Sequence, residues 1–207
     1  MVFMRRESIK EFLALYPITA LIVLLNTMVF LASLIIGFFA DNNTAIYWGG
    51  ISREGIEQGE YYRLITYAFL HDGIIHFASN MIFAILLAPY IEKILGRFIF
   101  ILFFIAAILA TPLYDIFYTN ELSVGESGFG FALFGFYLFL VLFQKEFLDK
   151  DSRVTVIIFM SIGWIASFII TNINISGHVC GFAAGFLAAL FTKNLRKSIQ
   201  IKNTLQM

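Results

Sequence analysis

The sequence predicts an all-α polytopic membrane protein with six transmembrane helices and both termini in the cytoplasm. Its 207 residues are 60% hydrophobic and 14% charged, which places the chain outside the soluble globular class. Long segments without a charged side chain recur along it, and the basic residues gather on one side of the membrane that these segments define. The two patterns lead to the same fold class independently.

Five segments lack Asp, Glu, Lys and Arg and define the spans: residues 17–39, 73–91, 98–114, 127–144 and 154–192. The last is too long for one crossing at about 20 residues per span. Its polar interruption TNINISG, residues 171–177, divides it into a fifth span near 154–170 and a sixth near 178–191. Six spans result.

The basic residues orient these spans. With a cytoplasmic N-terminus, twelve of the fourteen Lys and Arg residues lie inside: Arg5, Arg6, Lys10, Lys93, Arg97, Lys145, Lys150, Arg153, Lys193, Arg196, Lys197 and Lys202. Arg53 and Arg63 fall outside. Such a bias is typical of the positive-inside rule and predicts that both termini are cytoplasmic.

We expect one membrane domain over residues 1–207, with a short cytoplasmic N-terminal segment 1–16 and a C-terminal tail 193–207. The first apolar segment is too long for a typical signal peptide, so we interpret it as a retained span. Cys180 is the only cysteine, which excludes an intrachain disulfide. No basic nucleic-acid patch is present, and the lipid bilayer is the expected surrounding.

Polar residues gather at one predicted depth. The even-numbered spans all run from outside to inside, so their starts share a level near the outer leaflet. His76 and Asn80 lie near the start of span two, Ser127 at the start of span four and His178 at the start of span six. Ionisable side chains are expensive at membrane depth, so each is a functional hypothesis.

Spacing within the spans refines this site. His76 and Asn80 are four residues apart and share one helix face. The sixth span carries small residues at four-residue spacing: Gly177, Gly181 and Gly185. This stripe lets helix backbones approach closely and would bring His178 toward a neighbouring span. A serine nucleophile needs its base within about 2.6–3.2 Å, and close approach makes that distance attainable.

Each feature also has a structural interpretation. Serines beside glycine are common in membrane helix contacts, a histidine at a helix start can bond a loop, and Asn80 can join two helices. The glycine-flanked Ser127 together with the histidines nevertheless favours acyl-transfer chemistry inside a bilayer.

The motifs resemble those of the rhomboid family of intramembrane serine proteases over most of the chain. FLHDGIIHFASNM, residues 69–81, resembles the family's second-span motif with two histidines and an asparagine. GESG, residues 125–128, resembles its GxSG motif, and HVCGFAAG, residues 178–185, its HxxGxxxG motif. Glu92 and Gly96 match a further family pattern just beyond span two.

The resemblance implies a Ser-His dyad with Ser127 as nucleophile and His178 as general base. It also implies an oxyanion hole made by His76, Asn80 and the Ser127 backbone N–H. Supporting positions carried over from the motifs are His71, Gly125, Gly128, Phe131, Gly181 and Gly185. Phe131 replaces a tyrosine of some members and can stack under the histidine. No cofactor and no metal are implied, and the implied substrates are single-span proteins of the cell membrane, cut near its outer face.

Glu126 is the unusual residue of the GESG motif. Beside a nucleophile, an inward carboxylate would raise the pKa of a neighbouring histidine or repel a developing oxyanion. We therefore expect Glu126 to face the outer water.

Three alternatives remain. A zinc hydrolase would use His71, His76, His178 and Asp72 as ligands, although the chain has no HExxH motif. A non-catalytic rhomboid-like protein would bind or escort membrane helices and would not need both Ser127 and His178. A transporter is weakest, because the sequence has no repeat symmetry.

Overall fold

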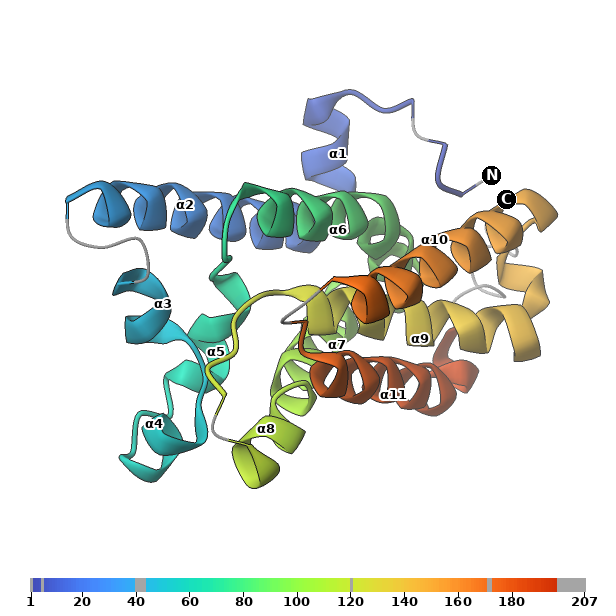
Figure 1. Ribbon diagram of the computed structural model, residues 1–207. Helices are drawn as coiled ribbons and strands as arrows, with labels where there is room; N and C mark the ends of the chain where they lie inside the picture. Colours follow the sequence, from blue (N-terminus) through green and yellow to red (C-terminus); the bar gives the residue numbers. More distant parts are fainter. Residues whose placement is uncertain (1, 5, 40–43, 120, 171–172, 197–207) are drawn as a thin grey trace.

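The computed structural model describes residues 2–4, 6–39, 44–119, 121–170 and 173–196 (Figure 1). Thr171 and Asn172 of the predicted TNINISG divider, and the C-terminal tail beyond residue 196, lie outside this range. In chain order the elements are α1 (Ile9–Leu15), α2 (Pro17–Phe39), α3 (Thr44–Gly49), α4 (Arg53–Glu57), α5 (Arg63–Thr66), η1 (Tyr67–Phe69), α6 (Ile74–Leu95), α7 (Arg97–Ala110), α8 (Leu113–Tyr118), α9 (Ser127–Phe143), η2 (Lys145–Phe147), α10 (Lys150–Ile169) and α11 (Ile175–Phe191).

A helix lies at each of the six predicted segments. Among the described residues, four stretches are long and apolar enough to cross a bilayer: Pro17–Gly37, Ile74–Leu95, Arg97–Tyr118 and Lys150–Ile169. The apolar helices α9 and α11 have 17 residues each, or about 26 Å at 1.5 Å per residue. The chain is therefore a multi-pass helical membrane protein.

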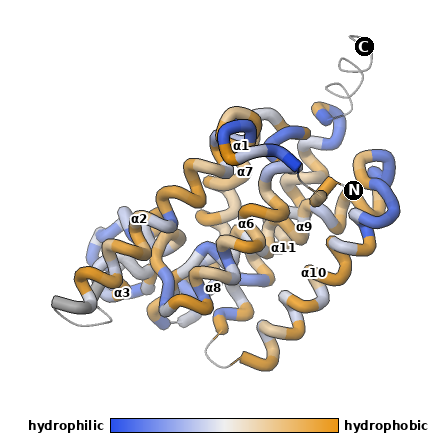
Figure 2. Tube along the Cα trace, turned by 90° about the horizontal axis from the view of Figure 1, so that it is seen from above, coloured by the Kyte–Doolittle hydropathy of each residue, from blue (hydrophilic) through white to orange (hydrophobic). Residues whose placement is uncertain are grey.

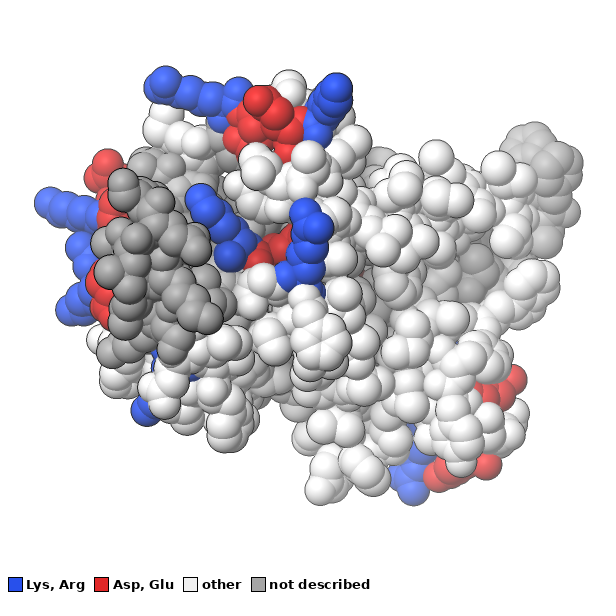
Figure 3. All heavy atoms as spheres, turned by 180° about the vertical axis from the view of Figure 1, so that it is seen from behind, with Lys and Arg blue, Asp and Glu red and all other residues white. Residues whose placement is uncertain are grey.

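Hydropathy and charge agree with this assignment. Apolar residues run along the helices, and hydrophilic residues concentrate in the connections and at helix ends (Figure 2). On the face seen in Figure 3, charged side chains gather toward two opposite edges, with a broad uncharged region between them. A bilayer would surround that uncharged region.

Helix α9 is the centre of the bundle (Figure 1). Its sequence SGFGFALFGFYLFLVLF has no charged residue, and most of its side chains are buried, among them Phe129, Leu133, Phe136 and Leu140. A helix that is apolar on all sides is suited to burial among other helices. The starts of α9, α11 and α6 lie at one end of the bundle, beside α3, α4, α5 and α8.

The backbones of α9 and α11 touch. A Cβ atom added at Gly181 would lie 2.2 Å from the Gly128 carbonyl oxygen, and one at Gly185 would lie 1.8 Å from that of Ala132. These distances leave no room for a side chain. The predicted glycine stripe therefore does bring the helix of His178 against another span, and that span is the one that begins at Ser127.

Glu92 connects the long helices α6 and α2 through hydrogen bonds. Its buried carboxylate, near the end of α6, accepts the backbone N–H groups of Ile18 at 3.0 Å and Thr19 at 2.8 Å, and the Thr19 hydroxyl at 2.7 Å. The first N–H groups of α2 have no partner within their own helix, and an acidic group also interacts favourably with this end of the helix dipole. Glu92 thereby caps α2 from α6.

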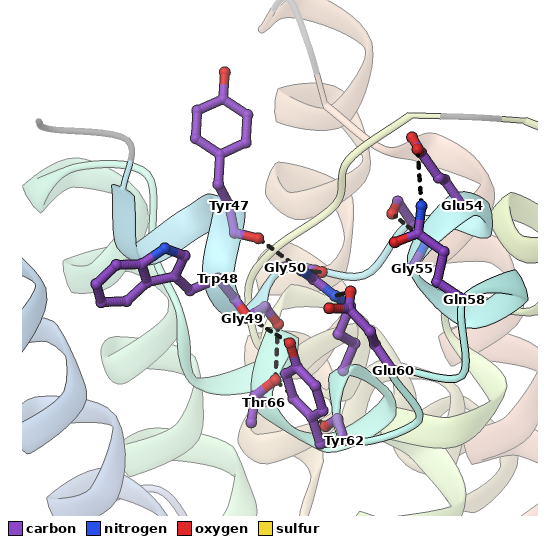
Figure 4. A network of polar contacts seen from close by, with 12 residues as sticks. Tyr47, Trp48, Gly49, Gly50, Glu54, Gly55, Gln58, Glu60, Tyr62 and Thr66 are labelled. Carbon is purple, nitrogen blue, oxygen red and sulfur yellow. Dashed lines mark hydrogen bonds and ion pairs between the residues drawn. The ribbon is translucent and has the colours of Figure 1, made fainter.

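Arg63 and Thr66 hold the long connection between α2 and α6 together. Figure 4 shows Thr66 beside Gly49 of this connection. The buried Arg63 guanidinium donates to the carbonyl oxygens of Tyr47 at 2.8 Å and Gly50 at 2.6 Å. The Thr66 hydroxyl donates to the Gly49 carbonyl oxygen at 2.8 Å. Helix α3 is thus bound to α5, and the connection forms a packed element at the end of the bundle where α9 begins.

The contact of α9 with α11 predicts a specific instability. We expect Gly185→Ala to lower the free energy of unfolding by about 1–3 kcal/mol, because its methyl group must push the α9 backbone away. Gly130→Ala is the matched control, since a Cβ there would meet no atom within 4 Å. That substitution should be neutral or stabilise α9 by about 0.5–1 kcal/mol. Thermal unfolding in detergent measures both, and equal effects would contradict the packing argument.

Candidate functional site

Ser127 and His178 line one small cavity at the end of the bundle where α9 and α11 begin. Ser127 is the first residue of α9, and His178 lies in the first turns of α11. The cavity offers about 10 Å³ to the centres of water molecules, close to the least volume that holds one water. The sequence predicted that these two side chains would share a depth, and the structure brings both to the same cavity.

Two contacts fix the imidazole of His178, one with the face of the ring and one with a ring nitrogen. The Phe131 ring stacks on it with 3.9 Å between ring centroids and 12° between planes. The Ser167 hydroxyl of α10 lies 2.8 Å from its Nδ1. Stacking by Phe131 was expected, whereas the contact with Ser167 was not. A serine four residues after Gly163 in an apolar span was the available signal, and that pattern is also typical of structural serines.

His76 and Asn80 of α6 meet the motif glycine Gly125. A Cβ atom at Gly125 would lie 2.6 Å from His76 Nε2 and 3.7 Å from Asn80 Nδ2. Gly125 also has φ of +112°, a conformation that other residues rarely adopt. Asn80 is buried, and its Nδ2 donates to no acceptor among the described residues. Two potential donors therefore lie beside the turn that precedes Ser127.

His71 lies behind His76. Their ring centroids are 5.2 Å apart in an edge-to-face arrangement, and Phe77 packs edge-on against His71 at 5.4 Å. Burial, followed by the charge of His76, lowers the pKa of His71 to about 3 and keeps its ring neutral. His71 contacts a predicted site residue and is not itself among the residues that line the cavity.

The prediction that Glu126 faces the outer water is wrong. Its side chain is 2% exposed, and neither carboxyl oxygen has a hydrogen-bond partner in the described part of the chain. The residue lies immediately before α9, where the turn points its side chain into the protein. Burial raises the pKa of the Glu126 carboxyl well above its ordinary value and favours the neutral acid. A neutral group does not repel a developing oxyanion.

Two backbone contacts fix the segment that leads to Ser127. Ile51 of the connection between α2 and α6 and Ser123 form an antiparallel bridge, with N–H to oxygen distances of 2.9 and 2.8 Å. The Gly125 N–H donates to the Tyr67 carbonyl oxygen at 2.9 Å, and the Tyr67 hydroxyl donates to the Ile108 carbonyl oxygen. The turn before the predicted nucleophile is thereby bound to both the α2–α6 connection and α7.

Asp115 of α8 organises the start of α11. Its buried carboxylate accepts the hydroxyls of Ser123 at 3.2 Å and Ser176 at 3.0 Å, and the side-chain amide of Asn174. Asn174 in turn caps α11 by accepting the Gly177 N–H at 2.7 Å. The sequence patterns did not predict this network. The signal was available, because Asp115 is an acid in an apolar segment.

The glycines flanking Ser127 and those of α11 serve close packing. Gly128 faces Thr111, whose Oγ1 would lie 2.1 Å from an added Cβ, and it also contacts Gly181.

In the described ranges, no three His, Cys, Asp or Glu side chains gather in a way that could hold a metal ion. The zinc alternative therefore has no ligand set within the described residues.

The comparisons with known proteins agree on one family. The model of the Rhomboid domain matches residues 58–194. Putative rhomboid protease YdcA of Bacillus subtilis is 32% identical over 196 residues, which cover 89% of this chain and 93% of that protein. Rhomboid protease GluP of Bacillus subtilis is 30% identical over 173 residues, covering 83% of this chain and 34% of that protein. Rhomboid-like protease 1 of Toxoplasma gondii is 29% identical over 160 residues, covering 74% and 55%.

Proposed function

Because the chain belongs to the rhomboid family, we propose that it is an intramembrane serine endopeptidase with a dyad of Ser127 and His178. The observation that carries the proposal is the cavity lined by both side chains, at the starts of two helices whose backbones touch. The contacts of Gly181 with Gly128 and of Gly185 with Ala132 bring the helices of the two residues close together.

The dyad would act in two half-reactions. The Ser127 hydroxyl oxygen attacks the scissile carbonyl carbon while its proton passes to Nε2 of His178. The carbon–nitrogen bond then breaks, and His178 returns the proton to the leaving amine. In the second half-reaction His178 takes a proton from water, whose oxygen attacks the carbonyl carbon of the acyl ester. The bond between that carbon and the Ser127 oxygen then breaks as His178 returns the proton to Ser127. The cavity beside both residues is large enough for one such water.

Asn80 and His76 would stabilise the oxyanion together with the Ser127 backbone N–H. The buried Nδ2 of Asn80 is a donor that makes no hydrogen bond to the described chain, and it lies beside Gly125. Such a donor is available to the charge that develops on the substrate oxygen. In a low-dielectric site its stabilising effect is larger than in water.

We propose six crossings, a single membrane domain, both termini in the cytoplasm and a site near the outer face of the cell membrane. The substrates would be single-span membrane proteins. Their scissile segment must unwind, since helical backbone shields its own carbonyl groups.

The shortness of α9 supports a site below the membrane surface, because a helix of about 26 Å does not fill a hydrocarbon core of about 30 Å. The outer connections cover the start of α9.

The first test of function concerns the nucleophile. We expect Ser127→Ala to lower cleavage of a helix-weak transmembrane substrate by at least about 10⁴-fold and to abolish labelling by a fluorophosphonate. Ser161→Ala, an exposed serine on α10, is the control and should cleave normally. Full cleavage by Ser127→Ala would refute the dyad. A folded wild type that binds the substrate without cutting it would support the non-catalytic alternative.

The role of Asn80 gives a second prediction. Asn80→Ala should lower kcat by about 10²–10³-fold with little change in KM, because the oxyanion exists only along the reaction path. Ser79→Ala, the exposed neighbour on α6, serves as control. Thermal stability is measured on the same preparations. A normal rate for Asn80→Ala, or a loss explained by unfolding, would return Asn80 to a structural role between helices.

The proposed topology predicts accessibility from the two sides. In a Cys180→Ala background, a cysteine at the exposed Glu57 should react with an impermeant maleimide in intact cells. One at the exposed Glu146 should react only after permeabilisation. The reverse pattern would invert the orientation and move the site to the cytoplasmic half of the membrane.

A further inference from the structure

Ser167 connects α10 to the predicted general base. Its side chain is 3% exposed, and its hydroxyl oxygen lies 2.8 Å from Nδ1 of His178 on α11. The same hydroxyl donates to the Gly163 carbonyl oxygen, one turn earlier in α10, at 2.8 Å. Ser167 is thus a buried hydroxyl with two partners, one of them a ring nitrogen of the proposed catalytic histidine.

The number of protons decides the direction of the bond. A serine hydroxyl has one proton to donate and two lone pairs to accept with. When that proton is given to the Gly163 carbonyl oxygen, the contact with His178 exists as a hydrogen bond only if Nδ1 carries a proton. A neutral imidazole with Nδ1–H has a bare Nε2, which is the form that can take a proton from Ser127.

Ser167 is the neighbour of His178 that can accept a hydrogen bond from Nδ1–H. Asp115 lines the same cavity, but its two carboxyl oxygens accept bonds from Ser123, Asn174 and Ser176. In the described chain, the hydrogen-bond partner of Nδ1 is the Ser167 hydroxyl. Among the described residues, no carboxylate therefore takes the position of a third member of the site.

Helix α10 also fixes the plane of the ring. Phe131 stacks on His178, and Trp164 of α10 packs edge-on against Phe131 with 4.7 Å between centroids. Stacking keeps the imidazole from tilting out of its plane, and the Ser167 hydrogen bond keeps it from rotating within that plane. With Nδ1 held by α10, Nε2 lies on the far side of the ring from Ser167.

We propose that Ser167 is a positioning residue that holds His178 in its Nδ1–H tautomer and so prepares Nε2 as the base for Ser127. This inference rests on the proposed Ser127–His178 dyad. It adds a third side chain to the site and gives α10 a part in the chemistry.

The tautomer is directly observable. Histidine-selective ¹⁵N labelling of the wild-type protein in detergent should show His178 with a proton on Nδ1 and none on Nε2 at neutral pH. His178→Asn identifies the signals by removing them. Ser167→Ala should give a population with the proton on Nε2. A wild-type His178 protonated on Nε2 would overturn the proposal without any substitution at Ser167.

Kinetics supply the second readout. An orienting carboxylate whose loss gives the wrong tautomer is worth about 10⁴ in kcat, and an uncharged hydroxyl should be worth less, about 10- to 100-fold. We therefore expect Ser167→Ala to lower kcat by that factor with KM unchanged, because Ser167 is not placed to touch substrate. Ser167→Thr keeps the hydroxyl and should restore both kcat and the tautomer. Ser161→Ala is the matched control on the same helix.

The outcomes separate the two proposals. Ser167→Ala with normal kcat and normal tautomer overturns the positioning role and leaves the dyad intact. A stable Ser167→Thr that is as slow as Ser167→Ala also overturns it, because the hydroxyl would not be the cause. Full cleavage by Ser127→Ala instead refutes the dyad, whatever the tautomer of His178. If Ser167→Ala fails to fold, the tautomer of His178 in the wild type decides whether the positioning role stands.

Discussion

The contact between the backbones of α9 and α11 determines the rest of the structure. In a bilayer the hydrophobic effect does not draw helices together, because lipid tails are as apolar as the side chains. Close association depends on surfaces without side chains, and Gly181 and Gly185 supply them against the carbonyl oxygens of Gly128 and Ala132. Ser127 adjoins one end of this contact and His178 lies three residues before Gly181. The separation of the proposed nucleophile and base is therefore set by backbone packing.

The polar network at the end where α9 and α11 begin follows from the same arrangement. Because α9 and α11 are short, their first turns lie where loops cover them, and buried backbone groups there need partners. Asp115, the Ile51–Ser123 bridge and the Tyr67 carbonyl provide those partners. Each contact joins a loop to the segment before Ser127 or to the start of α11. The loops thus stabilise the two positions that the glycine contact brings together.

The sequence was sufficient for features that follow from pattern within one span. Apolar length located the six helical segments, four-residue spacing identified the glycine face of α11, and the motif placed Phe131 beside His178. Contacts that depend on the rotation of one helix about its axis relative to another were not accessible. Ser167 meets His178 for that reason, and hydropathy does not determine the rotation of α10. The orientation of Glu126 was predicted wrongly because charge was taken to imply exposure.

A serine beside the proposed base suits the environment better than a carboxylate would. An ionised carboxylate at this depth must be stabilised against a large desolvation penalty. Glu126 illustrates the consequence, since burial raises the pKa of its carboxyl and favours the neutral acid. A neutral carboxyl is not a reliable acceptor for Nδ1–H, because its own proton can compete for the same nitrogen. The Ser167 hydroxyl avoids this competition by giving its proton to Gly163. It selects a tautomer without a buried charge. The imidazolium formed during attack is then stabilised by the developing oxyanion, which itself accepts hydrogen bonds from the donors around it.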